Sequence, residues 1–204
     1  MKELFLNIAS KYATDASLPV QFWRELEKNY SQKKRHYHTL THIESMLRQA
    51  EENRAAVEDW DVFALAIFYH DAVYQVLKSD NEEKSAALAE SRLTQLGLSK
   101  DRIDACSALI LATKTHQLST NETCNLLLDI DLSVLGASWE RYEEYAGQIR
   151  REYAIYPDFL YKPGRKKVLE RFLERDFIFK TPAFRARLEA QARKNLRREL
   201  TTLL

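Results

Sequence analysis

Glycine, proline and cysteine are scarce in this sequence. Among 204 residues there are 4 glycines, 4 prolines and 2 cysteines. An all-β sandwich reverses its chain many times and needs many more glycine and proline residues, so the composition argues against that fold class. Cys106 and Cys124 form no C-x-x-C motif. This spacing argues against a disulfide framework and against a cysteine zinc site, and it suits a reducing compartment.

The sequence also lacks an excess of either charge and any long apolar run. Lysine and arginine number 31, aspartate and glutamate number 30, and the net charge is +1. Bulk electrostatics therefore give no reason to expect nucleic acid as a partner. No segment approaches the roughly 18 uninterrupted apolar residues of a membrane span, and the N-terminus has no apolar signal core. We expect a soluble, cytoplasmic protein with no membrane partner.

What the sequence does have is helical periodicity along most of its length. Apolar residues recur three or four positions apart in each periodic segment, which is the spacing of one helix face. The last segment carries the longest such stripe, formed by Phe184, Leu188, Ala192, Leu196 and Leu200. No alternating strand pattern is present. We predict an all-α fold with about ten helices, arranged as a single domain over residues 1–204.

Several residues predict where helices begin and end. The ranges 41–44 (T-x-x-E) and 80–83 (D-x-x-E) have the spacing of a capping box, in which two side chains satisfy the first backbone N–H groups. Thr181 precedes a proline, which is typical of a cap followed by the first helical residue. Gly97 and Gly136 each follow an apolar run, where a left-handed residue would end a helix.

Histidine is the residue type that points to chemistry. Of only five histidines, His36, His38 and His42 lie within one short segment, RHYHTLTHI. His70 ends the apolar run WDVFALAIFYH and is followed at once by Asp71. A helix this apolar should be buried, and burying an imidazole and a carboxylate side by side is costly unless each is paired or bound to a cation. A bound metal ion would remove that cost.

A second acidic pattern interrupts the apolar segment LLLDIDLSVLG, at Asp129 and Asp131. At least one of these carboxylates should point into the interior and needs a partner there. Two imidazoles and two carboxylates from three helices form a mixed nitrogen and oxygen site, which suits a borderline divalent cation such as Mn²⁺, Co²⁺, Ni²⁺, Fe²⁺ or Zn²⁺. The predicted ligands are His42, His70, Asp71 and Asp131.

The order of these four residues resembles the H…HD…D signature of the HD-domain superfamily of metal-dependent phosphohydrolases. A closer resemblance, over nearly the whole chain, is to a predicted phosphohydrolase branch of about this length. It is carried by segments such as YHTLTHI (37–43), FYHDAVY (68–74) and LDIDLSVLG (128–136). The resemblance implies a helical bundle around a divalent metal ion, with Mg²⁺ added to the candidates. It also favours Asp131 as the ligand, and leaves Asp129 either beside the ligands or on the helix surface.

The resemblance extends to catalytic roles. The spacing of His38 and His42 resembles the HxxxH of cyclic-nucleotide phosphodiesterases, where the first histidine looks like a general acid, and the pKa of a histidine suits that role near neutral pH. His116 is a second candidate proton donor or phosphate ligand. Arg150 and Arg165 lie in family-like stretches, and we expect one of them, Arg150 in the first place, to neutralise phosphate. Other basic candidates are Arg35, Lys114 and Lys166.

The predicted function is therefore metal-dependent hydrolysis of a small phosphomonoester or phosphodiester, with a nucleotide as one candidate substrate. A non-catalytic helical module that keeps a metal or a nucleotide is one alternative. A di-iron oxygenase of HD fold is another, although such a site needs further histidines and only His116 lies between Asp71 and Asp131. The sequence leaves open whether the protein is a monomer or a homodimer.

Overall fold

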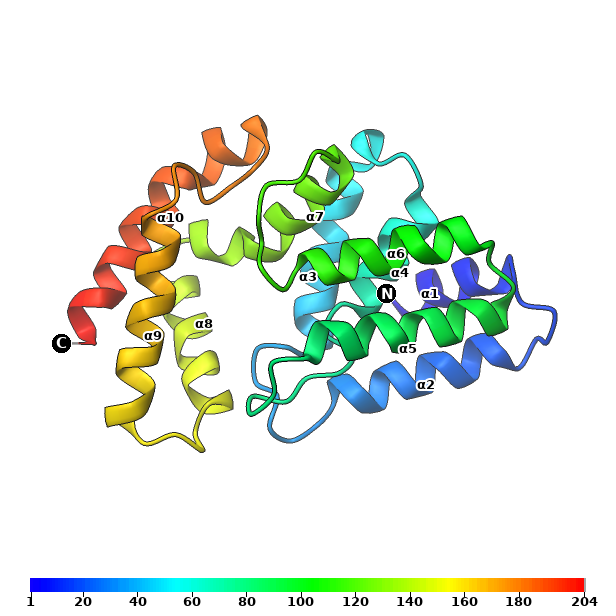
Figure 1. Cartoon of the computed structure of the whole chain (residues 1–204), viewed down its shortest axis with the longest axis horizontal. Helices are drawn as coiled ribbons and strands as arrows, with labels where there is room; N and C mark the ends of the chain where they lie inside the picture. Colours follow the sequence, from blue (N-terminus) through cyan, green and yellow to red (C-terminus); the bar gives the residue numbers. More distant parts are fainter. Residues whose placement is uncertain (204) are drawn as a thin grey trace. The chain divides into compact units, whose positions relative to one another are not determined.

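The computed structural model describes residues 1–203, and this range contains ten α-helices, two short 3-10 helices and no β-strand (Figure 1). The predicted fold class and number of helices are thus confirmed. Internal contacts divide the chain into two compact units, unit 1 (Met1–Leu127) and unit 2 (Leu128–Leu204). The single domain expected over residues 1–204 stays a prediction. No helix within residues 1–203 has both the length and the apolar character that a membrane span requires.

Unit 1 is organised around one buried helix. That helix, α4 (Trp60–Tyr69), is apolar except for Asp61 in its first turn, and its residues 62–69 are all buried. A helix of this kind is stable only at the centre of a core, because it has no polar face for water. The other helices of unit 1 are α1 (Lys2–Ser10), α2 (Leu18–Tyr30), α3 (Leu40–Glu52), η1 (Arg54–Ala56), α5 (Asn81–Leu96) and α6 (Lys100–Ala112). Helices α5 and α6 pack side by side, and α6 also packs on α4 (Figure 1).

Helix α7 (Glu122–Asp131) crosses the boundary between the two units as one continuous helix. Its start is fixed inside unit 1, where the side chain of Asn121 accepts a hydrogen bond from the backbone N–H of Cys124 at 2.8 Å. Buried Asn125 also exchanges two hydrogen bonds with the backbone of Ser119. Asp131 is the last residue of this helix.

Unit 2 contains η2 (Leu132–Gly136), α8 (Trp139–Glu152), α9 (Asp158–Leu173) and α10 (Pro182–Thr202). The predicted apolar stripe of α10 faces inward, because Phe184, Ala192 and Leu196 are buried. Helix α10 packs on η2 and on α9. The expected left-handed stop at Gly136 is wrong. A Cβ atom there would lie 2.6 Å from the Cβ of Leu188, so a glycine is required because α10 passes close by.

The predicted helix boundaries agree where the signal is strongest. The Thr181 side chain accepts a hydrogen bond from the N–H of Phe184, with Pro182 at the first helical position. Gly97 ends α5 with a φ of 90°, in the left-handed region.

Neither predicted capping box forms, because no side chain accepts a capping hydrogen bond at the start of α3 or of α5. Helix α3 begins at Leu40 after Thr39, so Thr41 lies inside the helix. Asp80 does stand at the cap of α5, but its side chain makes no capping bond and pairs with Lys84 instead. The carboxylate of Asp80 therefore pairs with the ammonium group of Lys84 instead of accepting a hydrogen bond from a backbone N–H of the helix.

Candidate metal centre

Three of the four predicted ligands come together in the structure. His42 lies in the first turn of α3, His70 directly follows α4, and Asp131 ends α7. One ligand atom from each of these residues lies within 4.8 Å of the other two, so the group could hold a metal ion. Both histidines are buried and Asp131 is half-buried. The imidazole rings of His42 and His70 have centroids 5.4 Å apart.

The end of α4 positions His70. The hydroxyl of Tyr30 donates a hydrogen bond to the carbonyl of Phe68 at 2.9 Å, and the N–H of His70 still bonds back to Ala66. Because α4 is buried on all sides, the residue at its end has its ring in the interior. Only 1% of the His70 surface is exposed.

The ring of His70 is oriented as in many metal-ligating histidines. Its Nδ1 lies 2.9 Å from the carbonyl oxygen of Ile67, and a carbonyl can only accept a hydrogen bond, so Nδ1 carries the hydrogen. The Nε2 atom lies 3.0 Å from Oδ2 of Asp71. When only Nδ1 is protonated, these two atoms are both acceptors and repel each other. A second proton or a cation at this point removes the repulsion. A backbone carbonyl behind the ring is the usual support of a metal ligand.

Asp71 stands beside the three-residue group. Its Oδ2 lies 3.0 Å from Nε2 of His70 and 3.9 Å from Nε2 of His38. Its role as a fourth ligand stays a prediction.

His38 lies next to the same group. Its ring stacks on Tyr74, with centroids 4.3 Å apart and an interplanar angle of 30°, and its centroid lies 6.0 Å from that of His42. The side chain is half-buried, at 19% exposure. His38 therefore has a defined orientation beside the candidate ligands, whereas His36 is exposed.

Arg35 has a positioning role that the sequence analysis missed. Its guanidinium donates to the backbone carbonyls of Asp71 at 2.6 Å and of Ala72 at 3.1 Å, and it also reaches the carbonyl of His38 at 3.3 Å. The guanidinium also lies over the rings of Tyr30 and Tyr74. Arg35 is buried and ties the segment of His38 to the segment of Asp71, which fixes both for the site.

Two other candidates lie after α6. His116 is half-buried and has a φ of 49°, the left-handed conformation that histidine tolerates better than most residues. Its catalytic role stays a prediction. Lys114, a candidate for binding phosphate, donates to the carbonyl of Ser79 and pairs with the carboxylate of Glu83.

The two arginine candidates lie in unit 2 and have structural partners there. Arg150 donates to Asp158 and to the carbonyls of Tyr153 and Tyr156, which holds the connection between α8 and α9. The catalytic role predicted for Arg150 stays a prediction. Arg165 is buried in an ion pair with Glu199.

Asp129 does not lie on the helix surface, which was one of the two places expected for it. It is fully buried, and its two carboxylate oxygens accept hydrogen bonds of 2.7 Å from the backbone N–H groups of Lys180 and Thr181. Burial raises the pKa of Asp129, and these hydrogen bonds act in the opposite direction. Its carboxylate therefore holds the start of α10 in place.

No family model, no curated protein and no solved structure matches this chain. The resemblance to the HD-domain superfamily therefore depends on the residues quoted above, and the function is a proposal.

Proposed function

We propose that this protein is a metal-dependent phosphohydrolase that cleaves a small phosphomonoester or phosphodiester. The observation that carries the proposal is the group of His42, His70 and Asp131, whose ligand atoms lie within 4.8 Å of one another. Two imidazoles and a carboxylate are the donors that Mn²⁺, Fe²⁺, Co²⁺, Ni²⁺ and Zn²⁺ share. The orientation of His70 by the Ile67 carbonyl supports it, because its Nε2 is then the atom available to a cation.

A divalent cation at such a site supplies a bound water of lowered pKa and polarises a phosphoryl oxygen. The chain itself supplies orientation. Arg35 holds the backbone on both sides of the site, and Tyr74 fixes the plane of the His38 ring. His38 is the proton donor that we assign to the leaving oxygen, because it lies beside the ligands and faces the carboxylate of Asp71. The substrate class is one carrying a phosphoryl group and an alkoxide or phenoxide leaving group.

Metal content and turnover test the proposal together. Purified protein, loaded in turn with Mn²⁺, Zn²⁺, Co²⁺ or Mg²⁺, is analysed for bound metal and assayed with p-nitrophenyl phosphate and bis(p-nitrophenyl) phosphate. We expect at least about one bound metal ion per chain, and we expect phosphoester hydrolysis to require that ion. His70→Ala should lose both, while His36→Ala, which changes an exposed histidine, should keep both. Full metal occupancy in His70→Ala would overturn the assignment of ligands.

Metal binding without any phosphoester hydrolysis would instead favour a non-catalytic metal-binding module. Two iron atoms per chain with oxygen consumption would favour the oxygenase. Either result would replace the proposal.

The role of His38 has its own test. His38→Ala should keep its metal and lose about 10²- to 10⁴-fold in turnover with phenyl phosphate, whose leaving group needs a proton. With p-nitrophenyl phosphate, whose leaving group departs as an anion, the loss should be much smaller. An equal loss with both substrates would contradict general acid catalysis by His38.

A further inference from the structure

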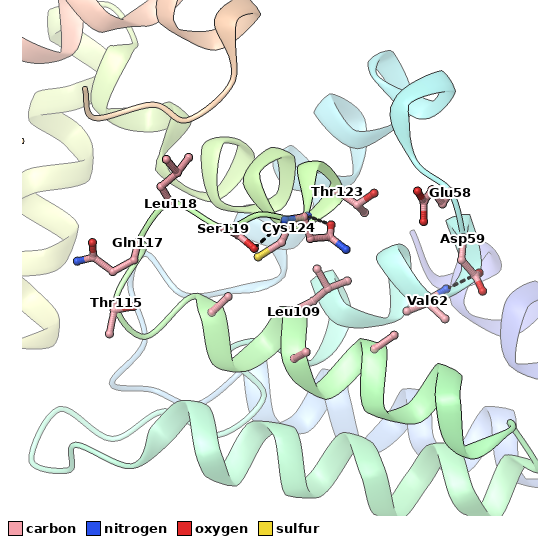
Figure 2. Close-up of a pocket in the computed structure, with 14 residues that line it drawn as sticks. Glu58, Asp59, Val62, Leu109, Thr115, Gln117, Leu118, Ser119, Thr123 and Cys124 are labelled. Atoms are coloured by element: carbon pink, nitrogen blue, oxygen red, sulfur yellow. Dashed lines mark hydrogen bonds between the residues drawn. The ribbon is translucent and has the colours of Figure 1, made fainter. Parts of the chain in front are cut away.

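A second candidate binding site lies in unit 1 and shares no residue with the metal group. It is a pocket of about 390 Å³, lined by 14 residues from the start of α4, the outer face of α6 and the segment that leads into α7 (Figure 2). Pockets that hold small molecules begin at roughly 300 Å³. We call this cavity the α6 pocket.

The floor of the α6 pocket is apolar and hollow because its residues are small. Ala105, Ala108 and Ala112 recur at helical spacing along α6, and Leu109 and Val62 complete the apolar surface. Ala105 and Ala108 are exposed. A longer side chain at either alanine position would fill the space. The hollow therefore depends on these alanines, and it suits the apolar body of a ligand.

The walls of the pocket are held in fixed positions before any ligand binds. On one side, Asp59 accepts the N–H of Val62 at 3.1 Å and forms two hydrogen bonds of 2.7 Å with Arg102. On the other side, Asn125 exchanges two hydrogen bonds with Ser119. A preformed site of this kind loses little conformational entropy on binding.

The charge of the pocket is negative at one end. Figure 2 shows Glu58 and Asp59 at one end and Thr115, Gln117 and Leu118 at the other. No lysine, arginine or histidine is among the lining residues. The charge of Asp59 is already balanced by Arg102. Burial raises the pKa of Asp59, but the hydrogen bonds from Arg102 and from the N–H of Val62, together with the charge of Arg102, lower it overall. Glu58 is exposed and has no ion pair among the described residues, so its carboxylate is available to a ligand.

The far end of the pocket carries an exposed apolar side chain. Leu118 is 69% exposed, although the loop that carries it is anchored by Ser119. A ligand lying along the floor toward this end would cover part of Leu118. The pocket therefore fits a ligand that has an apolar body and one positive group. The apolar body would lie in the middle of the pocket and against Leu118, and the positive group would lie at the Glu58 end.

We propose that the α6 pocket binds a small organic cation, namely an amine with one aromatic ring or a short aliphatic chain. Its ammonium group pairs with Glu58, and its apolar body lies on the alanines of α6. The sign of the charge separates this site from the candidate metal centre, since a phosphoester is an anion and would be repelled by Glu58. The inference does not depend on the proposed function.

Binding of three probes of similar shape tests the proposal. The probes are 2-phenylethylamine, neutral 2-phenylethanol and anionic 3-phenylpropionate, titrated into the intact protein and followed by calorimetry and by backbone amide chemical shifts. We expect the amine to bind about two- to fivefold more tightly than the alcohol, which is the range of an exposed ion pair. The anion should bind most weakly, and the shifts should map to α6 and to the residues around Ser119.

Two variants with matched controls locate the site. Glu58→Gln should remove the preference for the amine over the alcohol, and Glu143→Gln, at an exposed position of α8, should keep it. Ala108→Leu should weaken both ligands more than tenfold by filling the hollow, whereas Ala87→Leu, at an exposed position of α5, should not.

Four results would overturn the proposal. They are undetectable binding of the amine, equal binding of the amine and the anion, binding unchanged by Ala108→Leu, and a dimer in solution that Ala108→Leu dissociates. The last result would assign the pocket to a second copy of this chain. None of them bears on metal content or phosphoester hydrolysis, so the two proposals fail separately.

Discussion

Two groups of ionisable residues, one in each unit, differ in how their donors and acceptors are matched. In unit 2, Arg165 forms two hydrogen bonds of 2.8 and 3.0 Å with Glu199, and the hydroxyl of Tyr142 donates to the same carboxylate. In unit 1, the Nε2 of His70 faces the carboxylate of Asp71, and both are acceptors when Nδ1 carries the ring hydrogen. A buried group whose donors and acceptors match is structural. A buried group in which acceptors face each other calls for a proton or a cation.

The largest effect should come from breaking the matched group. Glu199→Gln removes the negative charge beside buried Arg165 and should lower the free energy of unfolding by about 3–5 kcal/mol, because an uncompensated buried cation remains. Urea denaturation measures it, with Glu143→Gln as the control at an exposed site. A loss below about 1 kcal/mol would show that the pair is solvated, and the comparison would fail.

A metal ion should raise the free energy of unfolding through the unit 1 group and not through the unit 2 group. Saturation with a binding ion at a hundredfold excess over its dissociation constant should add about 2.7 kcal/mol to the free energy of unfolding. His70→Ala should abolish that gain, while Glu199→Gln should retain it even though the variant begins less stable. Thermal unfolding with and without the ion measures both. An equal gain in His70→Ala would place the ion elsewhere.

The two acidic residues of α7 allow a structural carboxylate and a predicted metal ligand to be compared within one helix. Asp129→Asn replaces a carboxylate that accepts two backbone hydrogen bonds and should cost about 2 kcal/mol, with metal content unchanged. Asp131→Asn should lose metal and leave the stability of the metal-free protein within about 1 kcal/mol. Denaturation and metal analysis of the two variants measure this. Loss of metal in Asp129→Asn and loss of stability in Asp131→Asn would show that Asp129 is the ligand and Asp131 the structural residue.

The last prediction concerns the pH dependence of stability and depends on Lys180, a buried cation of unit 2. Burial lowers its pKa to about 8, although Asp129 lies nearby and acts in the opposite direction. The unfolded chain, with the usual lysine pKa of 10.5, binds more protons between pH 8 and 10.5. The free energy of unfolding of the wild type should therefore rise with pH relative to that of Lys180→Met through this window, and the difference should stay constant just below it. Urea midpoints at pH 7, 9 and 10.5 for both proteins measure it, and parallel curves would contradict the pKa.

Several features followed from local sequence alone. The apolar run before His70 predicted a buried helix, because a helix without a polar face must lie in a core, and that run is α4. The Thr181-Pro182 start and the Gly97 stop were also predicted correctly, since each depends on one residue's own backbone and side chain. His42 and His70 were expected to share a metal site from the predicted mixed ligand set and from the resemblance, and the structure places their rings 5.4 Å apart.

Other features depended on contacts between segments far apart in the sequence. Arg35 was one of several basic candidates for binding phosphate, but its guanidinium donates to backbone carbonyls, two of which belong to residues 71 and 72. Gly136 was interpreted as a helix stop, but it is needed because Leu188 of α10 passes close by. The α6 pocket likewise requires three separate segments to meet around one row of alanines.

Asp129 and Asp131 show which features the sequence determines and which depend on the tertiary structure. The sequence by itself determined an all-α chain, a buried helix ending at His70 and an acidic pair within an apolar segment, because periodicity and the cost of burying charge act locally. Two residues two positions apart in a helix point in nearly opposite directions, so these acids cannot face the same neighbour. Which of them meets backbone N–H groups and which meets His42 and His70 depends on what packs on each side of α7. That choice belongs to the tertiary structure alone.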